Sequence, residues 1–524
     1  MITNSVKDIS LRLLPHEAAD ATIVKALVAN NLKVSLSEIS DFRIVRRSID
    51  ARMHKVMIQL QIRVFVGNEK PPQNPLLDLK YINVTNAQEI IIVGAGPGGL
   101  FAAIRLIELG LKPIVVERGK DIHERKKDLA LLNKNNPVNP ESNYAFGAGG
   151  AGAFSDGKLN TRSKKRGDLH RILDILHFHG ANENILIDAQ PHIGSDKLPI
   201  IIEKIGQTII DSGGELHFNT RMEDLLVEKN KIIGIVTSKG EKIFGKSVIL
   251  ATGHSARDVY TLLNNRGIKI EMKPFAMGVR VEHPQKLIDQ IQYHTPQGRG
   301  KFLPPATYSF TTQIRERGVY SFCMCPGGFI VPSMTENEQI VVNGMSPANR
   351  NSPFANSGMV VEIKLEDIPG IDKYGELAGL IYQNELEKNC FQNGGNNIIA
   401  PAQRLTDFIK GKLSFDLPKC SYLPGVVSAP LHIILPSEIS GRLREGFKCF
   451  GQWAKGYLDE DAVVVGVESR TSSPIRIPRN PETLQHIQIV NLFPCGEGAG
   501  YAGGIVSSAI DGERCAEMVL DYLK

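Results

Sequence analysis

Residues 89–119, EIIIVGAGPGGLFAAIRLIELGLKPIVVERG, decide the fold of this chain. Two apolar runs flank a glycine-rich turn and a helical apolar pattern, which predicts one strand–helix–strand unit. Gly94, Gly96 and Gly99 follow the G-x-G-x-x-G pattern, which allows a tight turn, close approach of the backbone to a pyrophosphate, and close packing of helix on strand. Glu117 ends the second run, where a carboxylate accepts a hydrogen bond from a ribose 2′-hydroxyl. The stretch therefore predicts a dinucleotide-binding unit with the phosphates at the helix N-terminus.

A glycine-rich segment at residues 494–508, PCGEGAGYAGGIVSS, indicates which dinucleotide binds. FAD reaches further across a sheet than its ADP half, so it needs a second set of contacts near the ribityl chain and the flavin ring. Glu497 would bind a ribityl hydroxyl, or the pyrophosphate through water. Gly503, Gly504 and Ile505 open the last helix, whose N–H groups would face the flavin and stabilise negative charge there; an ordinary helix cap is the alternative. We therefore predict FAD as the cofactor.

Together the two motifs resemble those of FAD-binding oxidoreductases in the glutathione-reductase and hydroxybenzoate-hydroxylase superfamily. This resemblance covers residues 89–165, 185–255 and 440–524. More narrowly, the segments AFGAGGAGAFSDGKLNTR, FCMCPGG, NGMS and VESRTSSPIR resemble a group of bacterial FAD-dependent dehydrogenases whose substrate is unassigned. The resemblance implies an α/β fold built on a doubly wound, Rossmann-like FAD-binding domain.

The resemblance also implies where the cofactor is held. An acid–arginine pair follows the second strand, NTRMEDLLVE would hold the adenine, and VILATGHS would end beside the cofactor. The loop GAGGAG at residues 147–152 would cover the cofactor, because glycines allow close backbone approach; a surface loop is the alternative. The expected FAD contacts are Gly94, Gly96, Pro97, Gly98, Gly99, Glu117, Arg118, Gly149, Gly150, Met222, Ala251, Thr252, Gly253, Gly496, Glu497, Gly503, Gly504 and Ile505.

The rest of the chain predicts further domains around this one. Residues 1–75 show strand and helix patterns that favour a small ferredoxin-like α+β domain. Residues 86–255 and 436–524 would form the two parts of the FAD-binding domain. Residues 256–435 lack the strand–helix–strand rhythm, so we expect an inserted antiparallel α+β domain that forms the substrate site or a cap. We find no second G-x-G-x-x-G of comparable quality, so NAD(P)H would act without a dedicated domain, and the electron donor or acceptor stays open.

Four residues are candidates for catalysis beside the flavin. Cys323 and Cys325 stand two apart in a strand pattern, so both thiols would face one cavity; two inert core thiols are the alternative. Arg470 would bind an anionic substrate group, and an ion pair with Glu468 is the alternative. His254 directly follows Ala-Thr-Gly, where it would serve as an acid or base or as hydrogen-bonded scaffold.

Composition narrows the class of protein. The 524 residues carry a net charge of +5, which argues for neither a nucleic-acid nor a membrane partner. Seven cysteines without C-x-x-C spacing predict no metal site and indicate reduced thiols, as in the cytoplasm. The N-terminal residues lack a signal-peptide pattern, and no run of about 18 apolar residues predicts a membrane span.

We therefore expect an FAD-dependent oxidoreductase, a dehydrogenase that transfers a hydride between the flavin and an unidentified small molecule. One alternative is a flavin-bound RNA-modifying or nucleic-acid-associated protein that binds through basic residues 43–55 of the N-terminal domain. Aromatic residues do not alternate with these basic ones, so a solvated strand face is the favoured interpretation. A third hypothesis is a thiol redox sensor that acts through Cys323 and Cys325.

Overall fold

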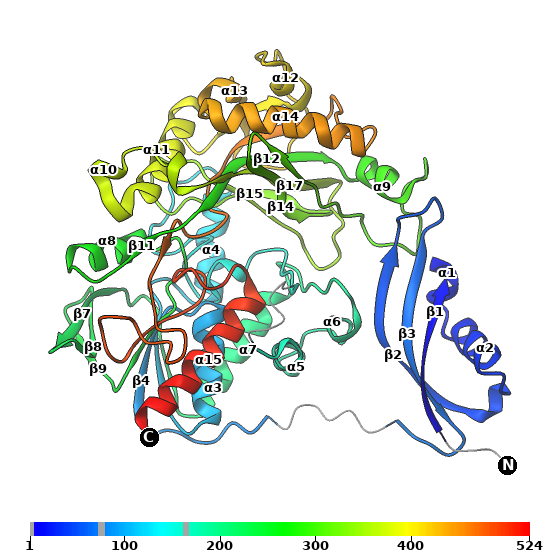
Figure 1. Ribbon diagram of the computed structural model, residues 1–524, viewed down its shortest axis with the longest axis horizontal. Coiled ribbons are helices and arrows are strands. Elements are labelled where there is room, and N and C mark those ends of the chain that lie inside the picture. The colour runs from blue at the N-terminus through cyan, green and yellow to red at the C-terminus, as the bar shows by residue number, and fades with distance from the viewer. Residues whose placement is uncertain (1–4, 72–78, 161–166) are drawn as a thin grey trace.

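The computed structural model describes residues 5–71, 79–160 and 167–524. Two layers dominate Figure 1: a lower domain built on a parallel sheet, and an upper domain built on a larger sheet under helix α14. A third, smaller domain from the N-terminal part of the chain stands beside both. Among the described residues, no helix is long and apolar enough to cross a membrane.

The N-terminal domain is a small antiparallel sheet with helices on one face. Its strands β1 (Ser5–Leu13), β2 (Ile39–Asp50) and β3 (Met57–Val66) take the order β1-β3-β2. Helices α1 (Pro15–Ala18) and α2 (Ala21–Leu32) pack on this sheet. The expected ferredoxin-like fold is only half present in the described residues, because that fold needs a second helix and a fourth strand. The proline-rich segment KPPQNP at residues 70–75, partly outside the described residues, follows β3 where that helix would begin.

The lower domain is built on a parallel sheet in the order β22-β10-β4-β5-β6. Side chains alternate between its faces: Ile90 and Ile92 pack against the helices, and Ile91 and Val93 pack on the other side. The strands are β4 (Glu89–Val93), β5 (Lys112–Val116), β6 (Glu215–His217), β10 (Val248–Leu250) and β22 (Leu492–Pro494). The helices on the first face are α3 (Pro97–Glu108), α5 (Leu169–Phe178), α7 (Leu198–Asp211) and α15 (Ile505–Leu523).

The second face of this sheet departs from the expected doubly wound arrangement. A three-stranded antiparallel sheet covers it together with helix α8 (Arg257–Asn265). This small sheet consists of β7 (Met222–Glu228), β8 (Lys231–Thr237) and β9 (Lys242–Phe244). Short strand patterns in this part of the sequence form hairpins rather than crossover helices, so helices cover one face and strands the other. Helices α4 (Ile122–Leu132) and α6 (Asn184–Ile187) complete the domain.

The upper domain contains a seven-stranded sheet in the order β13-β14-β17-β12-β20-β18-β19. All its neighbours pair antiparallel except β18 and β19, which are parallel. Its strands are β12 (Phe275–Pro284), β13 (Thr311–Ile314), β14 (Arg317–Cys325), β17 (Phe354–Ile363), β18 (Ala400–Arg404), β19 (Val426–Ser428) and β20 (Val463–Glu468). Two short pairs join β15 (Phe329–Pro332) to β16 (Val342–Met345), and β11 (Glu271–Met272) to β21 (Ile475–Arg476).

Helices of the upper domain cover its sheet. Helix α14 (Ser437–Trp453) lies across the top, and buried Leu443, Phe447 and Phe450 pack into the sheet's core. The other helices are α9 (Gln285–Tyr293), α10 (Ile371–Tyr374), α11 (Ala378–Asn393), α12 (Leu405–Lys410) and α13 (Leu431–Ile434). The boundary expected at residue 436 is therefore wrong. Both α14 and β20 belong to the upper domain. The sequence placed α14 in the wrong domain because an amphipathic helix pattern does not reveal which sheet the helix will cover.

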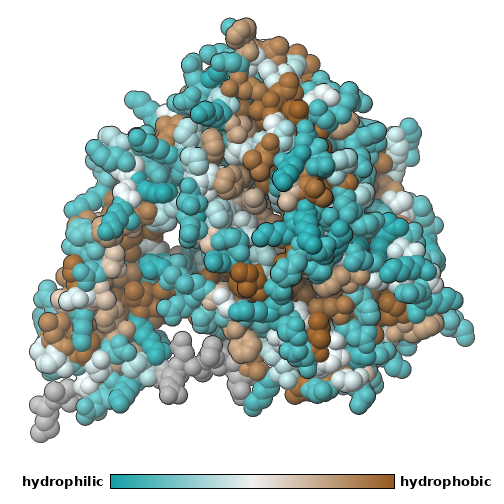
Figure 2. All heavy atoms as spheres, turned by 180° about the vertical axis from the view of Figure 1, so that it is seen from behind, coloured by the Kyte–Doolittle hydropathy of each residue, from teal (hydrophilic) through white to brown (hydrophobic). Residues whose placement is uncertain are grey.

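Seen from behind, the surface is mostly hydrophilic, with hydrophobic residues in separate small areas (Figure 2). The N-terminal domain meets the rest of the chain through apolar and polar contacts, with Val56 packed in the core of the upper domain and Leu303 packed on the core of the N-terminal domain. The Arg47 Nε atom lies 2.7 Å from the Asp188 carboxylate, and His294 Nε2 lies 2.9 Å from the Ala51 carbonyl. The domain is thus held at the side of the molecule by contacts with both the lower and the upper domain.

Candidate functional site

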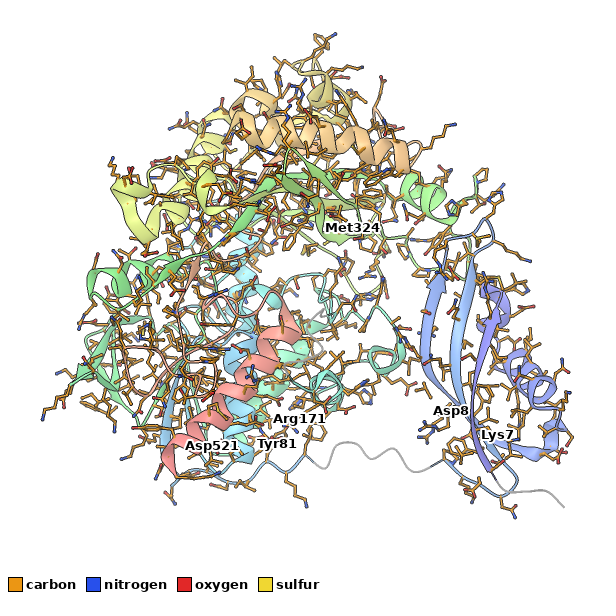
Figure 3. All side chains as sticks on the ribbon, in the orientation of Figure 1. Lys7, Asp8, Tyr81, Arg171, Met324 and Asp521 are labelled. Atoms are coloured by element: carbon orange, nitrogen blue, oxygen red, sulfur yellow. The ribbon has the colours of Figure 1, made fainter. Side chains whose placement is uncertain are left out.

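A cleft, partly open to solvent, lies between the lower and upper domains. It begins at the carboxyl ends of the parallel strands, at Val93, Val116 and Ala251. It ends at Phe322 and Cys323, near the end of β14. Met324, labelled in Figure 3, lies in the upper sheet on the side that faces the lower domain. Ligands of open α/β sheets bind at the carboxyl ends of the strands, so this cleft is the candidate site.

The glycine-rich turn shapes the floor of the cleft. Gly94 has φ +105°, and a Cβ atom there would lie 2.5 Å from the Ala251 carbonyl oxygen. A Cβ on Gly99 would lie 1.9 Å from the Gly94 oxygen, so helix and strand pack too closely for any side chain. A Cβ on Gly96, in contrast, would approach only the Gly150 Cα, at 3.8 Å. Gly96 therefore leaves open a space that a side chain would fill, as a pyrophosphate cradle requires.

The far end of the cleft is open in the same way. Gly253, Gly503 and Gly504 line it, and a Cβ on any of them would meet no atom within 4 Å. Helix α15 starts at Ile505, and no side chain caps its first N–H groups. Unpaired N–H groups and the positive end of the helix dipole therefore face the cleft. These residues fit FAD, whose two ends need separate backbone contacts.

Most of the expected cofactor residues line this cleft. They are Gly94, Gly96, Pro97, Gly98, Glu117, Arg118, Gly150, Met222, Ala251, Thr252, Gly253, Gly496, Glu497, Gly503, Gly504 and Ile505. Gly99 and Gly149 do not line it, which corrects their assignment as contacts. Gly99 packs on Gly94, and a Cβ on Gly149 would lie 2.3 Å from Ile202, so both glycines serve packing. Contact of the lining residues with FAD stays a prediction.

Glu117 is held differently from what the sequence suggested. Its carboxylate accepts backbone N–H bonds from Ala95 at 2.8 Å, Gly119 at 2.9 Å and Gly147 at 2.9 Å. It therefore ties the glycine-rich turn to residues 119 and 147. The bond to a ribose hydroxyl stays a prediction for its remaining acceptor sites.

Arg118 stands at the rim of the same end of the cleft. Its guanidinium lies 4.2 Å from the centre of the Phe146 ring and 2.9 Å from both Glu141 and Asp258. Burial opposes the charge, but the hydrogen bond and charge of Glu141 and Asp258 outweigh it and raise the pKa of Arg118. These contacts fix the guanidinium over an aromatic ring at the predicted adenine end.

Arg470 corrects the expectation of a free substrate-binding arginine. It lines the cleft, but its guanidinium donates to Glu387 at 2.9 Å, Thr335 at 2.8 Å and Gln339 at 3.0 Å. The alternative partner, Glu468, is also wrong. An arginine with these bonds holds the cleft wall rather than a substrate carboxylate.

Glu387 is the centre of a buried charge cluster in this wall. Its carboxylate binds both Arg470 and Arg257, the latter at 2.7 Å, and it is fully buried. Burial alone would raise the pKa of Glu387, but the charges and hydrogen bonds of Arg257 and Arg470 outweigh burial and lower it to about 2. The cluster carries one excess positive charge next to the cleft.

A second buried ion pair was missed by sequence reasoning. Arg280 on β12 lies 2.8 Å from Glu468 on β20, 2.7 Å from Asn356 and 2.8 Å from the Cys323 carbonyl. The Glu468 partner lies 188 positions away in sequence, and no local motif joins the two residues. Arg280 thus links the centre of the upper sheet to the cleft wall.

Cys323 and Cys325 do not face one cavity as the alternation of a strand predicted. Strand β14 shifts its register between Phe322 and Cys325, and Cys323 has φ +48°. This irregularity breaks the two-residue alternation. Cys323 lines the cleft, whereas Cys325 is fully buried behind it.

His254 lines the cleft 3.9 Å from a Glu497 oxygen. Burial lowers the pKa of His254, which favours the neutral ring. His254 and Glu497 are therefore adjacent titratable groups of the cleft, and the role of His254 as acid or base stays a prediction.

The basic residues of the N-terminal domain are partly neutralised. Arg47 pairs with Asp188, and Arg52 lies 2.9 Å from Asp50. These pairs favour the interpretation of residues 43–55 as a solvated strand face over a nucleic-acid surface.

One group of possible metal ligands lies among the described residues, at Cys495, Asp511 and Cys515. The Asp511 carboxylate already binds Arg479 at 2.6 Å and the Gly496 N–H at 2.8 Å. A guanidinium charge at this distance repels a cation. The hydrogen bonds of Asp511 therefore indicate that this cluster stabilises the turn at Gly496.

Comparison with known proteins connects the chain with FAD-dependent proteins. Residues 274–471 match the family described as FAD-dependent protein, C-terminal domain-like, and residues 5–65 match a domain of unknown function (DUF8436). A protein of Clostridium beijerinckii, described as uncharacterized, is 39% identical over 524 residues and 96% of each chain. A thiamine thiazole synthase of Methanococcus maripaludis is 29% identical over 196 residues, 35% of this chain and 63% of that enzyme.

Solved structures align with the chain at low similarity. CtdE in complex with FAD aligns with a TM-score of 0.31 and 11% identity over 82% of each chain. A geranylgeranyl bacteriochlorophyll reductase-like protein from Thermoplasma acidophilum aligns with a TM-score of 0.36 and 12% identity, over 83% of this chain and 78% of that chain. Similarities of this size carry no argument about function.

Proposed function

The chain belongs to a family of FAD-dependent proteins, and from this premise we propose that it is an oxidoreductase that moves a hydride between FAD and a small molecule held in the cleft. The observation that carries the proposal is the open cradle from Gly96 to Gly504. Protein atoms leave it free at both ends, and it continues to the cleft wall at Cys323. Bound there, FAD supplies an electron pair acceptor and donor for the substrate.

The protein's own residues would bind, orient and stabilise charge. The Gly96 turn and the start of α3 would hold the pyrophosphate. The first N–H groups of α15, behind Gly503 and Gly504, would stabilise negative charge at the other end of the cleft. The adjacent His254 and Glu497 are the titratable groups placed to move a proton at that end.

Similarity to a thiamine thiazole synthase over 35% of this chain is too partial to carry that activity over. The seven free cysteines fit a reducing compartment, so we place the protein in the cytoplasm.

One experiment tests the proposal directly. Purified protein should be yellow and should release FAD on denaturation. Under anaerobic conditions the absorbance of the bound flavin should bleach with NADH, NADPH or one member of a metabolite panel. Folded protein that stays colourless after incubation with FAD would refute the proposal.

A further inference from the structure

The end of strand β14 places two thiols at the cleft wall in an uncommon backbone arrangement. Cys323 has φ +48° within the irregular pairing of β14 and β17. A left-handed conformation at a residue other than glycine is strained, and such residues cluster at functional sites. This conformation turns Cys323 into the cleft and leaves Cys325 directly behind it.

The two thiols contact one another. The Cys325 Sγ donates to the Cys323 carbonyl oxygen at 3.4 Å, and the side chains of the two cysteines are close enough to affect one another's pKa. The Cys323 thiol in the cleft wall therefore has a second thiol, that of Cys325, beside it.

Positive charge surrounds the pair. The Arg280 Nη2 atom donates to the Cys323 carbonyl at 2.8 Å and lies 3.5 Å from the Cys325 Sγ. The Lys158 ammonium donates to the carbonyl of Met324, the residue between the two cysteines. The hydrogen bond from Cys325, with the charges of Lys158 and Arg280, lowers the pKa of Cys323. The same hydrogen bond, together with burial, raises the pKa of Cys325.

We propose that Cys323 and Cys325 form a redox-active dithiol that reduces a small disulfide substrate in the cleft. This inference names a substrate class for the proposed function and rests on it for the return of electrons. Cys323 is the attacking group because it lines the cleft, and Cys325 is the resolving group because it lies behind Cys323. Arg280 and Lys158 are positioning residues, since they act on the pair through backbone carbonyls and charge.

The exchange balances in atoms and electrons. The Cys323 thiolate attacks one sulfur of the substrate disulfide, forms a mixed disulfide and releases one substrate thiolate. Cys325 then loses its proton and attacks the Cys323 sulfur, so the second substrate sulfur leaves with that proton as a thiol. The two cysteines are oxidised to a disulfide, and the substrate disulfide is reduced to a thiolate and a thiol. Reduced FAD, when bound in the cleft, would supply the two electrons and one proton that return this disulfide to a thiolate and a thiol.

Of the other cysteines, Cys420 lies outside the cleft residues, and Cys495 and Cys515 form a second pair of neighbouring thiols. Cys390 is buried in the upper core, and Cys515 is buried beside Arg479. Cys495 lines the cleft and its sulfur lies within 4.8 Å of that of Cys515, but Cys495 is fully buried against Gly98, whereas Cys323 is only partly buried. Cys449 on α14 is partly exposed and lies outside the cleft residues, so it provides an internal reference.

The test mixes the holoprotein, with its thiols reduced and its flavin oxidised, with 4,4′-dithiodipyridine and maps the products by peptide mass spectrometry. We expect both thiopyridone groups to be released and one disulfide to join Cys323 and Cys325. Because a thiolate is the nucleophile, Cys323 should react at least about tenfold faster than Cys449 at neutral pH. Cys325→Ser should stop at a mixed disulfide on Cys323, and Cys323→Ser should lose the fast release.

The outcomes separate this inference from the proposed function. A stable adduct on wild-type Cys323, or unchanged fast release from Cys323→Ser, would overturn the dithiol even if the flavin is reduced normally. Conversely, a fast dithiol in protein that binds no FAD would support the thiol chemistry and refute the flavin function. Cys449→Ala should behave as wild type, and FAD content with circular dichroism should show that each variant is folded.

Discussion

The two walls of the cleft differ in whether backbone or side chains form them. The wall on the lower domain consists largely of backbone, at Gly96, Gly253 and Gly504, where the absence of side chains leaves room for a ligand. The wall on the upper domain includes buried side chains whose charges pair with one another, as in Arg280 with Glu468. The first wall has room for a ligand because side chains are absent from it, whereas the stability of the second wall depends on complete pairing of its buried charges.

Gly96→Val should have the largest effect, because it fills the backbone wall. Gly96 has φ −77°, so valine fits the backbone, but its side chain would occupy the cradle. We expect FAD affinity to fall at least about 1,000-fold, or about 4 kcal/mol, with little loss of folding. Fluorescence titration of apoprotein with FAD measures this. Gly441→Val on α14 is the matched control. If Gly96→Val retains its affinity for FAD, the backbone wall does not hold the cofactor.

Glu387→Gln should break the side-chain wall instead. It leaves Arg257 and Arg470 buried without a carboxylate, which costs about 3 kcal/mol or more of unfolding free energy. Denaturant unfolding measures the change. Glu385→Gln makes the same substitution at an exposed position of the same helix and should have little effect. Equal stability of the two variants would show that the buried charges are not needed for this wall.

The pH dependence of the unfolding free energy should test the contribution of the ionised Glu387 carboxylate separately. The pKa of Glu387 is about 2 in the folded protein and about 4.5 when unfolded, so its stabilisation is complete above the unfolded value and is lost as pH falls. From pH 6 to pH 3.5 the loss from this group is about 1 kcal/mol. The free energy of unfolding of the wild type should therefore fall more steeply than that of Glu387→Gln. If the unfolding free energies of the two proteins fall in parallel with pH, Glu387 does not have a lowered pKa in the folded protein.

Arg47→Ala should have the smallest effect, because it lies outside both walls. The Arg47–Asp188 pair is about one-third exposed on each side, with side-chain exposures of 36% and 33%. Such pairs contribute about 0–1 kcal/mol, and FAD affinity should not change. Limited proteolysis should show the N-terminal domain released sooner than in wild type, with Arg46→Ala as the exposed control. A large loss of FAD affinity would mean that this domain supports the cleft.

The comparison also explains what the sequence could predict. Gly94, Gly96 and Gly504 lie in short local patterns whose backbone requirement is the same wherever they occur, so the backbone wall was predicted with its residues. Arg470 and Glu387 are 83 positions apart, and their pairing depends on how the upper sheet folds. The partner of Arg470 was therefore assigned wrongly.

Two further differences have the same physical origin. The alternation argument for Cys323 and Cys325 failed because strand periodicity does not include an irregular pairing with another strand. Gly99 and Gly149 were expected at the cofactor because a glycine pattern does not distinguish close packing on protein from close approach to a ligand.

The closing elements of the lower domain have a consequence for biosynthesis. Strand β22 pairs with β10, and α15 packs on α3 so tightly that a Cβ on Gly512 would lie 2.0 Å from the Gly98 oxygen. These partners are translated only after the whole upper domain. A nascent chain therefore carries the face of α3 that packs on α15 uncovered through most of its synthesis. The cofactor pocket can be completed only when residues 492–523 have left the ribosome.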